Sequence, residues 1–504
     1  MRRLFLPLVT VSFWNDVETI QNFLNVNNEY SNIRKQINSV FGSVQLGYKD
    51  TYFVDATLRN DWSSALAEDY NSYLYPSVSG SFVFSNLLES ANFLSFGKLR
   101  ASYAEVGGDT GPYRLSQNYG VKDFSLLGKP LGEISGATLN KRDLKPTRTY
   151  SYKLGTDIRL FEDRLRLDVA YYHQLTRNQI LSLNIPSTSG YDMAVINAGE
   201  ILNEGFEVQL GATPVTLGDF SWDVTVNFAR NINSVPKLHE EVDTYILANA
   251  RWAGAAIVVK EGGKYGDIVG KKWLRDDEGK IVHNAAGLPM TDDAAGQQIL
   301  GNGQYDFTAG LINSFSYKGF SLRALIDWKS GADLYSMSSG IGHAQGTAEA
   351  TLEGRDAWYD SEEARLAAGI ENIADWTPTG GYIGEGVKNI GTADAPEYVT
   401  NDIPTNPQNY WGSLYTRSPE FFIYDASYVK LRELVFSYNL PKKFLGNIFT
   451  GASVSFVGRN LWLIYSNVPN VDPESGYNNG NGQGFEYGSI PSRRSYGFNL
   501  NLKF

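Results

Sequence analysis

Histidine is the first residue type to test for chemistry, because it serves in both metal binding and acid–base catalysis. The chain has four histidines, which are His173, His239, His283 and His343. None has the spacing of a zinc motif such as H-E-x-x-H, so we expect scattered loop or surface histidines and no metal. The acidic run at 276–278 predicts a hairpin turn, because Leu274 stands where an EF-hand loop needs its first ligand.

Patterns for covalent or general acid–base catalysis are equally weak. The pair Glu362-Glu363 has the chemistry of a glycosidase, but charges on a solvated loop are the favoured interpretation. Gly480–Gly488 is rich in glycine without the strand–helix context of a phosphate-binding loop. The chain contains no cysteine, which excludes disulfides and thiolate chemistry. We therefore expect no catalytic residue and no cofactor, and a protein that is not an enzyme.

Aromatic side chains in long loops are the best candidates for ligand contact. They are interleaved with Asp and Asn, and an aromatic face beside hydrogen-bonding groups suits a sugar ring. It suits a peptide or a protein lid equally well, and packing of the loops against one another is the favoured alternative. The candidates are Trp252, Trp273, Trp358, Trp376, Tyr382 and Trp411.

Charged residues at alternating strand positions form a second candidate set. Residues that face a water-filled lumen can contact a passing substrate, and they can equally be charges that compensate one another. The candidates for lining such a lumen are Arg100, Arg159, Arg166, Arg323 and Asp327.

The elements that must position these residues show a two-residue periodicity, which is typical of β-strands. Near the end of the chain Tyr496, Phe498 and Leu500 share one face, while Gly497 and Asn499 take the other. The same alternation recurs in 52–59, 164–171 and 221–228. A soluble sandwich would alternate too, so periodicity alone does not decide the fold.

The connections between strands separate the two interpretations. Tight turns are expected at 48–51, 161–164, 217–220 and 317–320, and between them lie long loops at 107–149, 177–202, 232–304, 331–423 and 463–493. Short turns at one end and long loops at the other are typical of outer-membrane barrels. The predicted fold is therefore an all-β, antiparallel transmembrane outer-membrane β-barrel with long extracellular loops.

Composition agrees with this fold class. The chain has 504 residues, more than one soluble core usually supports, with 31 Tyr, 26 Phe and 50 Gly. No window holds the roughly 18 consecutive apolar residues of a spanning helix. The net charge of −11 argues against a nucleic-acid partner, which would need a basic patch.

Several stretches resemble the barrel signatures of SusC/RagA-type, TonB-linked outer-membrane receptors. The resemblance runs from about Ser39 to Phe504, and the motifs follow the order of that family. They include Arg59–Ser64, Ser72–Ser79, Gly97–Tyr103, Asp425–Leu434, Gly458–Leu461, Asp472–Glu474 and Ser492–Gly497.

The resemblance implies TonB-dependent uptake of oligosaccharides, or of peptides, across the outer membrane of a Gram-negative, Bacteroidetes-like cell. It implies a SusD-like surface lipoprotein as a lid. No plug or TonB box is recognisable, so this chain is expected to be truncated. Contact with the TonB complex is expected only through the missing N-terminal part.

The expected organisation is an N-terminal edge segment at 1–37, with a strand and a loop, and the C-terminal part of the barrel at 38–504. The chain should hold about 13 or 14 strands of a presumed 22, about 13 of them from Asn38 onward. Without the other strands, we expect that this polypeptide alone cannot close a barrel in lipid.

Two other functions fit parts of the sequence. A passive porin, or a smaller barrel that closes on itself, is the first alternative. A soluble β-rich adhesin or carbohydrate-binding protein is the second, but the apolar faces of successive strands argue against it, because such patches aggregate in water.

Overall fold

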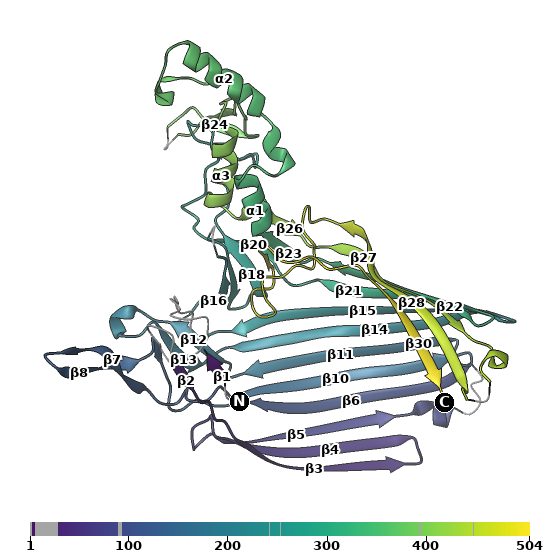
Figure 1. Ribbon diagram of the computed structural model, residues 1–504. Coiled ribbons are helices and arrows are strands. Elements are labelled where there is room, and N and C mark those ends of the chain that lie inside the picture. The colour runs from purple at the N-terminus through teal and green to yellow at the C-terminus, as the bar shows by residue number, and fades with distance from the viewer. Residues whose placement is uncertain are drawn as a thin grey trace, which may run out of the picture.

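The computed structural model describes residues 3–5, 29–88, 93–240, 242–251, 254–392, 395–446 and 448–504. Its main feature is a 13-stranded antiparallel sheet (Figure 1). The order of the strands in the sheet is the same as their order along the chain. The strands are β3 (Ile37–Tyr48), β4 (Tyr52–Ser63), β5 (Ser72–Phe82), β6 (Leu94–Gly108), β10 (Thr147–Leu160), β11 (Leu165–Arg177), β14 (Glu200–Leu217), β15 (Phe220–Lys237), β21 (Phe307–Tyr317), β22 (Phe320–Ser330), β27 (Tyr428–Asn439), β28 (Gly451–Ser466) and β30 (Ser495–Lys503).

The short turns all join strands at one end of this sheet. In the β3–β4 turn both central residues, Lys49 and Asp50, have positive φ of 51° and 50°. Such a backbone matches the right-handed twist of the flanking strands. Lys318 and Gly319 make the β21–β22 turn in the same way, with φ of 48° and 88°. The four tight turns predicted from the sequence, and the all-β fold itself, are confirmed.

The two outermost strands of the sheet each have one unpaired edge. In the described chain β3 pairs only with β4, and β30 pairs only with β28. The pairing of β3 with β30 that a self-closing barrel requires is therefore absent from the described sheet. This arrangement weighs against the smaller porin-like barrel.

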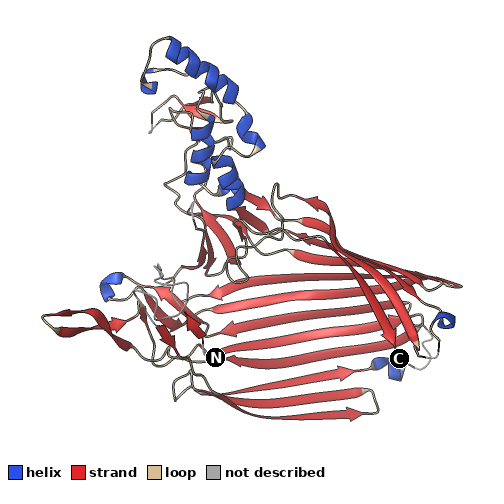
Figure 2. Ribbon diagram, viewed as in Figure 1, coloured by secondary structure: helices blue, strands red, loops and turns tan. Residues whose placement is uncertain are grey.

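The opposite end of the sheet carries the long connections, which fold into small sheets and helices (Figure 2). The sequence predicted plain loops there, because their strands are too short for periodicity to show. The short strands are β7 (Asn118–Leu126), β8 (Lys129–Ser135), β9 (Thr138–Leu139), β12 (Ile180–Asn184), β13 (Met193–Asn197), β16 (Thr244–Asn249), β17 (Ala256–Lys260), β18 (Tyr265–Gly270), β19 (Val282–His283), β20 (Gln298–Asn302), β23 (Asp333–Ser336), β24 (Val387–Asn389), β25 (Tyr398–Thr400), β26 (Ile423–Asp425) and β29 (Phe485–Glu486).

The connection between β22 and β27 rises furthest from the sheet, and we call residues 337–422 the tower (Figure 1). It contains three α-helices, α1 (Met337–Ala344), α2 (Arg355–Ala367) and α3 (Pro407–Arg417). The Asn406 side chain caps α3 by accepting from the Gln408 N–H at 2.8 Å, and Pro407 fills the first helical position. Short 3-10 turns are η2 (Phe84–Leu87), η3 (Ser187–Ser189), η4 (Glu349–Leu352), η5 (Ile373–Asp375), η6 (Glu420–Phe422) and η7 (Lys442–Phe444).

The largest hydrophobic core lies at the base of the tower and not behind the sheet. Ile257 and Ile268 of β17 and β18 pack there with Tyr335, Leu414 and Phe422. The loops from different parts of the chain thus form one packed body. Among the described residues no helix is long and apolar enough to cross a membrane.

Near the amino end, only β1 (Arg3–Phe5) and β2 (Glu29–Ser31) are described before residue 32, and they pair with each other. The remainder of the predicted 1–37 segment up to residue 28 lies outside the described residues.

Candidate functional site

The two faces of the large sheet differ sharply in chemistry. On β4, Tyr52, Val54 and Leu58 point to one face and are exposed, while Asp55 and Arg59 point to the other. Cross-strand register carries the same division over the whole sheet, with Leu154, Val226 and Phe436 on the apolar face. A wall that is apolar on one side and polar on the other fits between lipid and water.

Aromatic rings line the apolar face in two rows. Towards the loops, Phe206, Phe228, Phe307 and Trp328 form a chain of ring contacts 4.8–5.6 Å apart. Towards the short turns, Trp222 stacks on Phe315 with 6.0 Å between centroids. Residues 222 and 228 lie on the same strand about 20 Å apart at the usual rise. Two aromatic girdles flanking an apolar band are the signature of a membrane-spanning barrel wall.

On the polar face, arginines reach across a neighbouring strand over a glycine. Arg100 on β6 makes two hydrogen bonds of 2.8 and 2.6 Å to Asp168, two strands away on β11. Its path crosses Gly155 on β10, where a Cβ would lie 2.5 Å from the Arg100 Nε. The absence of a side chain there leaves room for the guanidinium, so the glycine is needed for the ion pair.

The same arrangement occurs twice more. Arg166 on β11 bonds to Asp223 on β15 across Gly211, where a Cβ would lie 2.8 Å from the Arg166 Nε. Tyr172 donates to Asn231 at 2.9 Å across Gly205. These long side chains connect strands that are not adjacent and brace the polar face of the wall.

All five residues predicted to line a lumen lie on this polar face, and four of them are in ion pairs. Besides Arg100 and Arg166, Arg159 lies 3.5 Å from Asp157, and Asp327 accepts from Arg432. Arg323 makes no hydrogen bond or ion pair among the described residues. The four pairs fit the alternative of mutually compensating charges, which leaves Arg323 as the uncompensated cation of the set.

A hollow of about 620 Å³ lies on this face, over β11, β14, β15, β21 and β22. Its wall offers carboxylates and amides, among them Asp168, Glu207, Gln209 and Asn227, together with Lys329. Such groups can exchange hydrogen bonds with hydroxyls or amides of a passing solute without holding it by one dominant contact.

A dense cluster of charges ties the connection at 467–494 to the wall, and we call it the latch. Glu474 accepts from Arg432 at 2.7 and 2.8 Å, from Lys430 at 2.7 Å and from the Tyr428 hydroxyl at 2.7 Å. Asp472 accepts from Lys430 at 2.8 Å. Lys430 is only 4% exposed, so this cation depends on these two carboxylates.

The latch holds Glu474 ionised. Burial of the Glu474 carboxyl acts to raise its pKa, but hydrogen bonds from Arg432, Lys430 and Tyr428 outweigh burial and hold the pKa well below its ordinary value. The pKa of Asp472 is lowered in the same way, against its own burial, by Lys430 and Ser492.

The 467–494 connection also reaches the tower base. Glu486 of β29 is buried and accepts from Ser336 and Ser338 at 2.7 Å each. Because β29 pairs with β23, this connection joins the barrel wall to the tower.

The structure separates the predicted aromatic contacts into two groups. Trp273 and Trp411 are buried in the core at the tower base, and Tyr382 packs against that core. Trp358 is half-buried beside a cavity, and the Trp376 Nε1 donates to Ser361 at 3.2 Å. Trp252 lies outside the described residues. Packing thus engages several of these residues, as the favoured alternative expected, while Trp358 also faces an open space.

Two histidines lie in the predicted long loops but are buried there and not at the surface. His283 is 1% exposed and stacks on Tyr410 at 6.1 Å, and His343 is 8% exposed against Trp411 and Phe422. Burial is the largest effect on the pKa of His283 and lowers it. Both rings pack against aromatic residues of the tower, which sequence spacing does not reveal. No group of three His, Asp or Glu that could hold a metal occurs in the described part of the chain.

The residues that sequence reasoning missed are the partners in these networks, namely Asp168, Asp223, Lys430, Arg432 and Glu474. Asp472 and Glu474 stood out as a family motif, but their role in the latch did not. A signal was present, because Lys430 and Arg432 interrupt an apolar strand, and buried cations need nearby carboxylates.

Comparison with known proteins agrees with this architecture. The model of the family described as "TonB dependent receptor-like, beta-barrel" matches residues 8–320, more than half of the chain. "TonB-dependent receptor P3" of Formosa agariphila is 28% identical over 502 residues, covering 92% of this chain and 45% of that receptor. "TonB-dependent receptor SusC" of Bacteroides thetaiotaomicron is 23% identical over 368 residues, covering 68% and 36%.

Among solved structures, the RagAB peptide transporter shares the fold, with a TM-score of 0.72 and 20% identity over 97% of this chain and 50% of that one. The sheet, its two faces and its loops define the wall of an outer-membrane barrel. The chain belongs to the TonB-dependent receptor-like β-barrel family, whose members are outer-membrane proteins and not enzymes. The predicted resemblance is confirmed, and the chain spans about half the length of the curated relatives it matches.

Proposed function

We propose that this chain forms the wall and extracellular loops of a receptor that imports oligosaccharides across the outer membrane. The observation that supports this most strongly is the two-faced sheet, with aromatic girdles on one face and a braced, hydrogen-bonding face on the other. A polar path with many weak contacts lets a hydroxyl-rich solute move without being trapped. Peptides are the second substrate class, because the fold is shared with the RagAB peptide transporter.

Energy coupling would follow the family pattern. TonB-dependent receptors draw on the inner-membrane TonB complex, and we infer that this contact is made by parts of the receptor outside the wall described here. The cell would be Gram-negative and Bacteroidetes-like, as the source organisms of the similar receptors suggest.

Uptake by intact cells tests this proposal. A strain without the gene should lose uptake of fluorescent oligosaccharides but keep uptake of the monosaccharide, and a protonophore should abolish oligosaccharide uptake in the parent strain. Uptake that persists with the protonophore would indicate a passive pore. Loss of peptide uptake alone would move the substrate to the second class.

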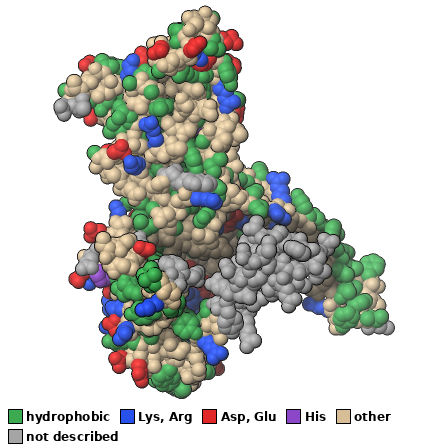
Figure 3. All heavy atoms as spheres, turned by 60° about the vertical axis from the view of Figure 1, so that its left-hand side comes forward, with side chains coloured by type: hydrophobic (Ala, Val, Ile, Leu, Met, Phe, Trp, Pro, Cys, Tyr) green, Lys and Arg blue, Asp and Glu red, His purple; other side chains and the backbone are tan. Residues whose placement is uncertain are grey.

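A SusD-like surface lipoprotein is the proposed partner, seated on the tower. The tower carries exposed apolar side chains, which mark interaction surfaces on proteins that are otherwise polar outside. Figure 3 shows hydrophobic side chains in patches over the tower, between charged ones. The most exposed in the described tower are Leu352, Tyr359, Leu366, Ile373, Ile383 and Ile390.

The double substitution Leu366→Asp/Ile373→Asp should weaken this partnership. The two side chains are 63% and 49% exposed, so the tower should still fold, but a charge in an apolar interface is costly. We expect lipoprotein that co-purifies with the tagged native receptor to fall by about tenfold or more. Glu363→Ala, a change of an exposed polar residue on α2, is the matched control. Unchanged co-purification in the double variant would exclude this surface as the seat of the lid.

A further inference from the structure

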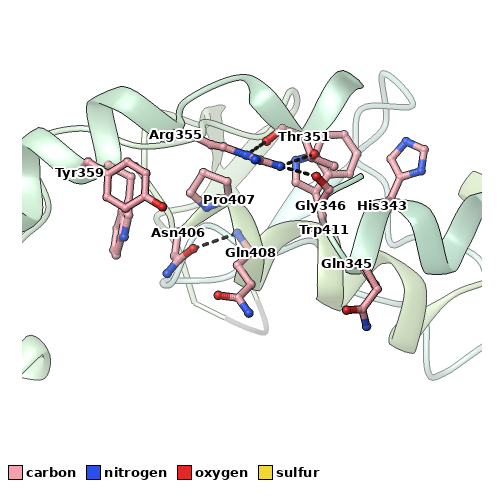
Figure 4. A pocket seen from close by; sticks show the side chains of 12 residues that line it. His343, Gln345, Gly346, Thr351, Arg355, Tyr359, Asn406, Pro407, Gln408 and Trp411 are labelled. Atoms are coloured by element: carbon pink, nitrogen blue, oxygen red, sulfur yellow. Dashed lines mark hydrogen bonds between the residues drawn. The ribbon is translucent and has the colours of Figure 1, made fainter. Parts of the chain in front are cut away.

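The tower contains a cavity that the transport path does not use. It has a volume of about 330 Å³ and lies between the end of α1, the start of α2 and the start of α3 (Figure 4). Small-molecule sites start at about 300 Å³, so this cavity has room for one sugar ring and a substituent and not for a longer oligomer.

One wall of the cavity presents a cation without a counter-ion. The Arg355 Nε donates to the Thr351 carbonyl at 2.7 Å, and Nη2 donates to the Gly346 carbonyl at 2.7 Å and to the Thr351 hydroxyl at 2.6 Å. These partners fix the guanidinium but are neutral, and Nη1 makes no hydrogen bond within the described chain. No acidic side chain is among the described residues that line the cavity.

Trp411 lines the same wall with its ring. Trp411 is 4% exposed, and its indole N–H has no hydrogen-bond partner among the described residues. This nitrogen has almost no accessible surface, so it is not a contact for a ligand in the cavity. The unengaged Nη1 of Arg355 favours an oxyanion.

The remaining lining suits a ring bearing hydroxyl groups. Trp358 and Tyr359 provide aromatic surface on α2, and Gln345 and Gln408 provide amides. Figure 4 shows Arg355 between Tyr359 on one side and His343 on the other. Aromatic faces with a few polar groups and one fixed cation match a pyranose that carries a negative charge.

We propose that this cavity binds one anionic sugar unit, a pyranose bearing a carboxylate or a sulfate ester. Arg355 would bind the oxyanion, and Trp358 would pack against the ring. The proposal rests on the proposed function for the source of the sugar, which would be an acidic oligosaccharide at the cell surface. The binding itself requires no transport.

Calorimetric titration of the purified full-length receptor in detergent tests the proposal, with glucuronate, glucose 6-sulfate, glucose and a blocked acidic dipeptide as probes. At least one anionic sugar should bind about tenfold or more tightly than glucose, as expected for charge-assisted hydrogen bonds. Glucuronate and glucose 6-sulfate distinguish the two sources of the oxyanion. Equal affinity for all three sugars, or preference for the dipeptide, would overturn the proposal.

Four variants separate recognition from folding. Arg355→Gln should reduce the preference for anionic sugar over glucose to near unity, while Arg355→Lys, which keeps the charge, should retain part of it. Trp358→Ala should weaken anionic and neutral sugars alike by about three- to tenfold. Arg417→Gln removes an exposed arginine outside the cavity and should change nothing. If Arg355→Gln does not fold, the Trp358 variant still decides, because unchanged binding there would contradict the assigned site.

The failure of this inference differs from that of the proposed function. Normal uptake with no sugar preference in the titration would refute only the proposal that the cavity binds an anionic sugar. Intact binding in a receptor whose deletion leaves oligosaccharide uptake unchanged would refute only the import function.

Discussion

Substitution of Glu474 by glutamine is expected to release the 467–494 connection from the wall. The change removes the carboxylate that accepts from Arg432, Lys430 and Tyr428. It leaves the buried Lys430 with one carboxylate, that of Asp472, and the hydroxyl of Ser492. Removing one partner from a buried ion pair costs about 3–5 kcal/mol. Hydrogen exchange of residues 467–494 in the native receptor should therefore become faster by two orders of magnitude or more, at about 1.4 kcal/mol per tenfold.

Glu433→Gln is the matched control, on the strand β27 that carries Lys430 and Arg432. Glu433 pairs with Arg459 at 3.0 Å, but the Arg459 side chain is 64% exposed, so this pair should contribute only about 0–1 kcal/mol. Similar exchange in wild type and in Glu474→Gln would contradict the latch.

The pH dependence of the latch follows from the lowered pKa of Glu474. A carboxyl group whose pKa is lower in the bound connection than in the released one stabilises the bound form at every pH above the released value, about 4.5. That contribution is lost as the pH falls below this value towards the lowered pKa. We expect constant protection from pH 8 to pH 5 and a loss only under stronger acid.

The second large effect concerns closure of the barrel. The 504-residue polypeptide alone is expected to give no folded, heat-modifiable species when it is refolded into detergent or lipid. The 12 residues of β3 and the 9 residues of β30 each pair on one side only in the described sheet. Unpaired backbone groups cost several kcal/mol each in lipid, so an open sheet of this size should not insert.

Gel migration with and without heating measures this closure, with the full-length receptor as the control that must shift. A heat-modifiable species formed by the 504 residues would show that β3 and β30 can pair. It would restore the smaller self-closing barrel as an explanation.

The wall could be predicted from the sequence because its strands and turns are specified by residues that are close together in the chain. Alternation at Tyr496–Phe504 or Val54–Leu58, together with tight turns such as Lys49-Asp50, fixes strand, face and register at once. The strand count of about 13 from Asn38 agrees with the 13-stranded sheet that starts at Ile37. The five lumen candidates share the polar face for the same reason.

The tower and the latch could not be predicted, because both depend on contacts between distant parts of the chain. Glu474 meets Arg432 across 42 positions, and Trp273 packs with Trp411 in a core built from separate loops. Short strands and helices of the loops carry too few residues for a periodic signal. A tryptophan in a polar loop looks the same in sequence whether it is buried, as Trp411 is, or half-exposed, as Trp358 is.

Thiol accessibility at neighbouring positions is the most direct test of the two faces of the wall. Gln209 lines the hollow on the polar face, and Val208 beside it on β14 points to the apolar face. The chain has no cysteine, so each single substitution gives one reactive site in this wall. In the full-length receptor in intact cells, a membrane-impermeant maleimide should label Gln209→Cys, more slowly when the oligosaccharide is present, and should leave Val208→Cys unlabelled. Labelling of Val208→Cys with protection of Gln209→Cys would contradict the assignment of lumen and lipid.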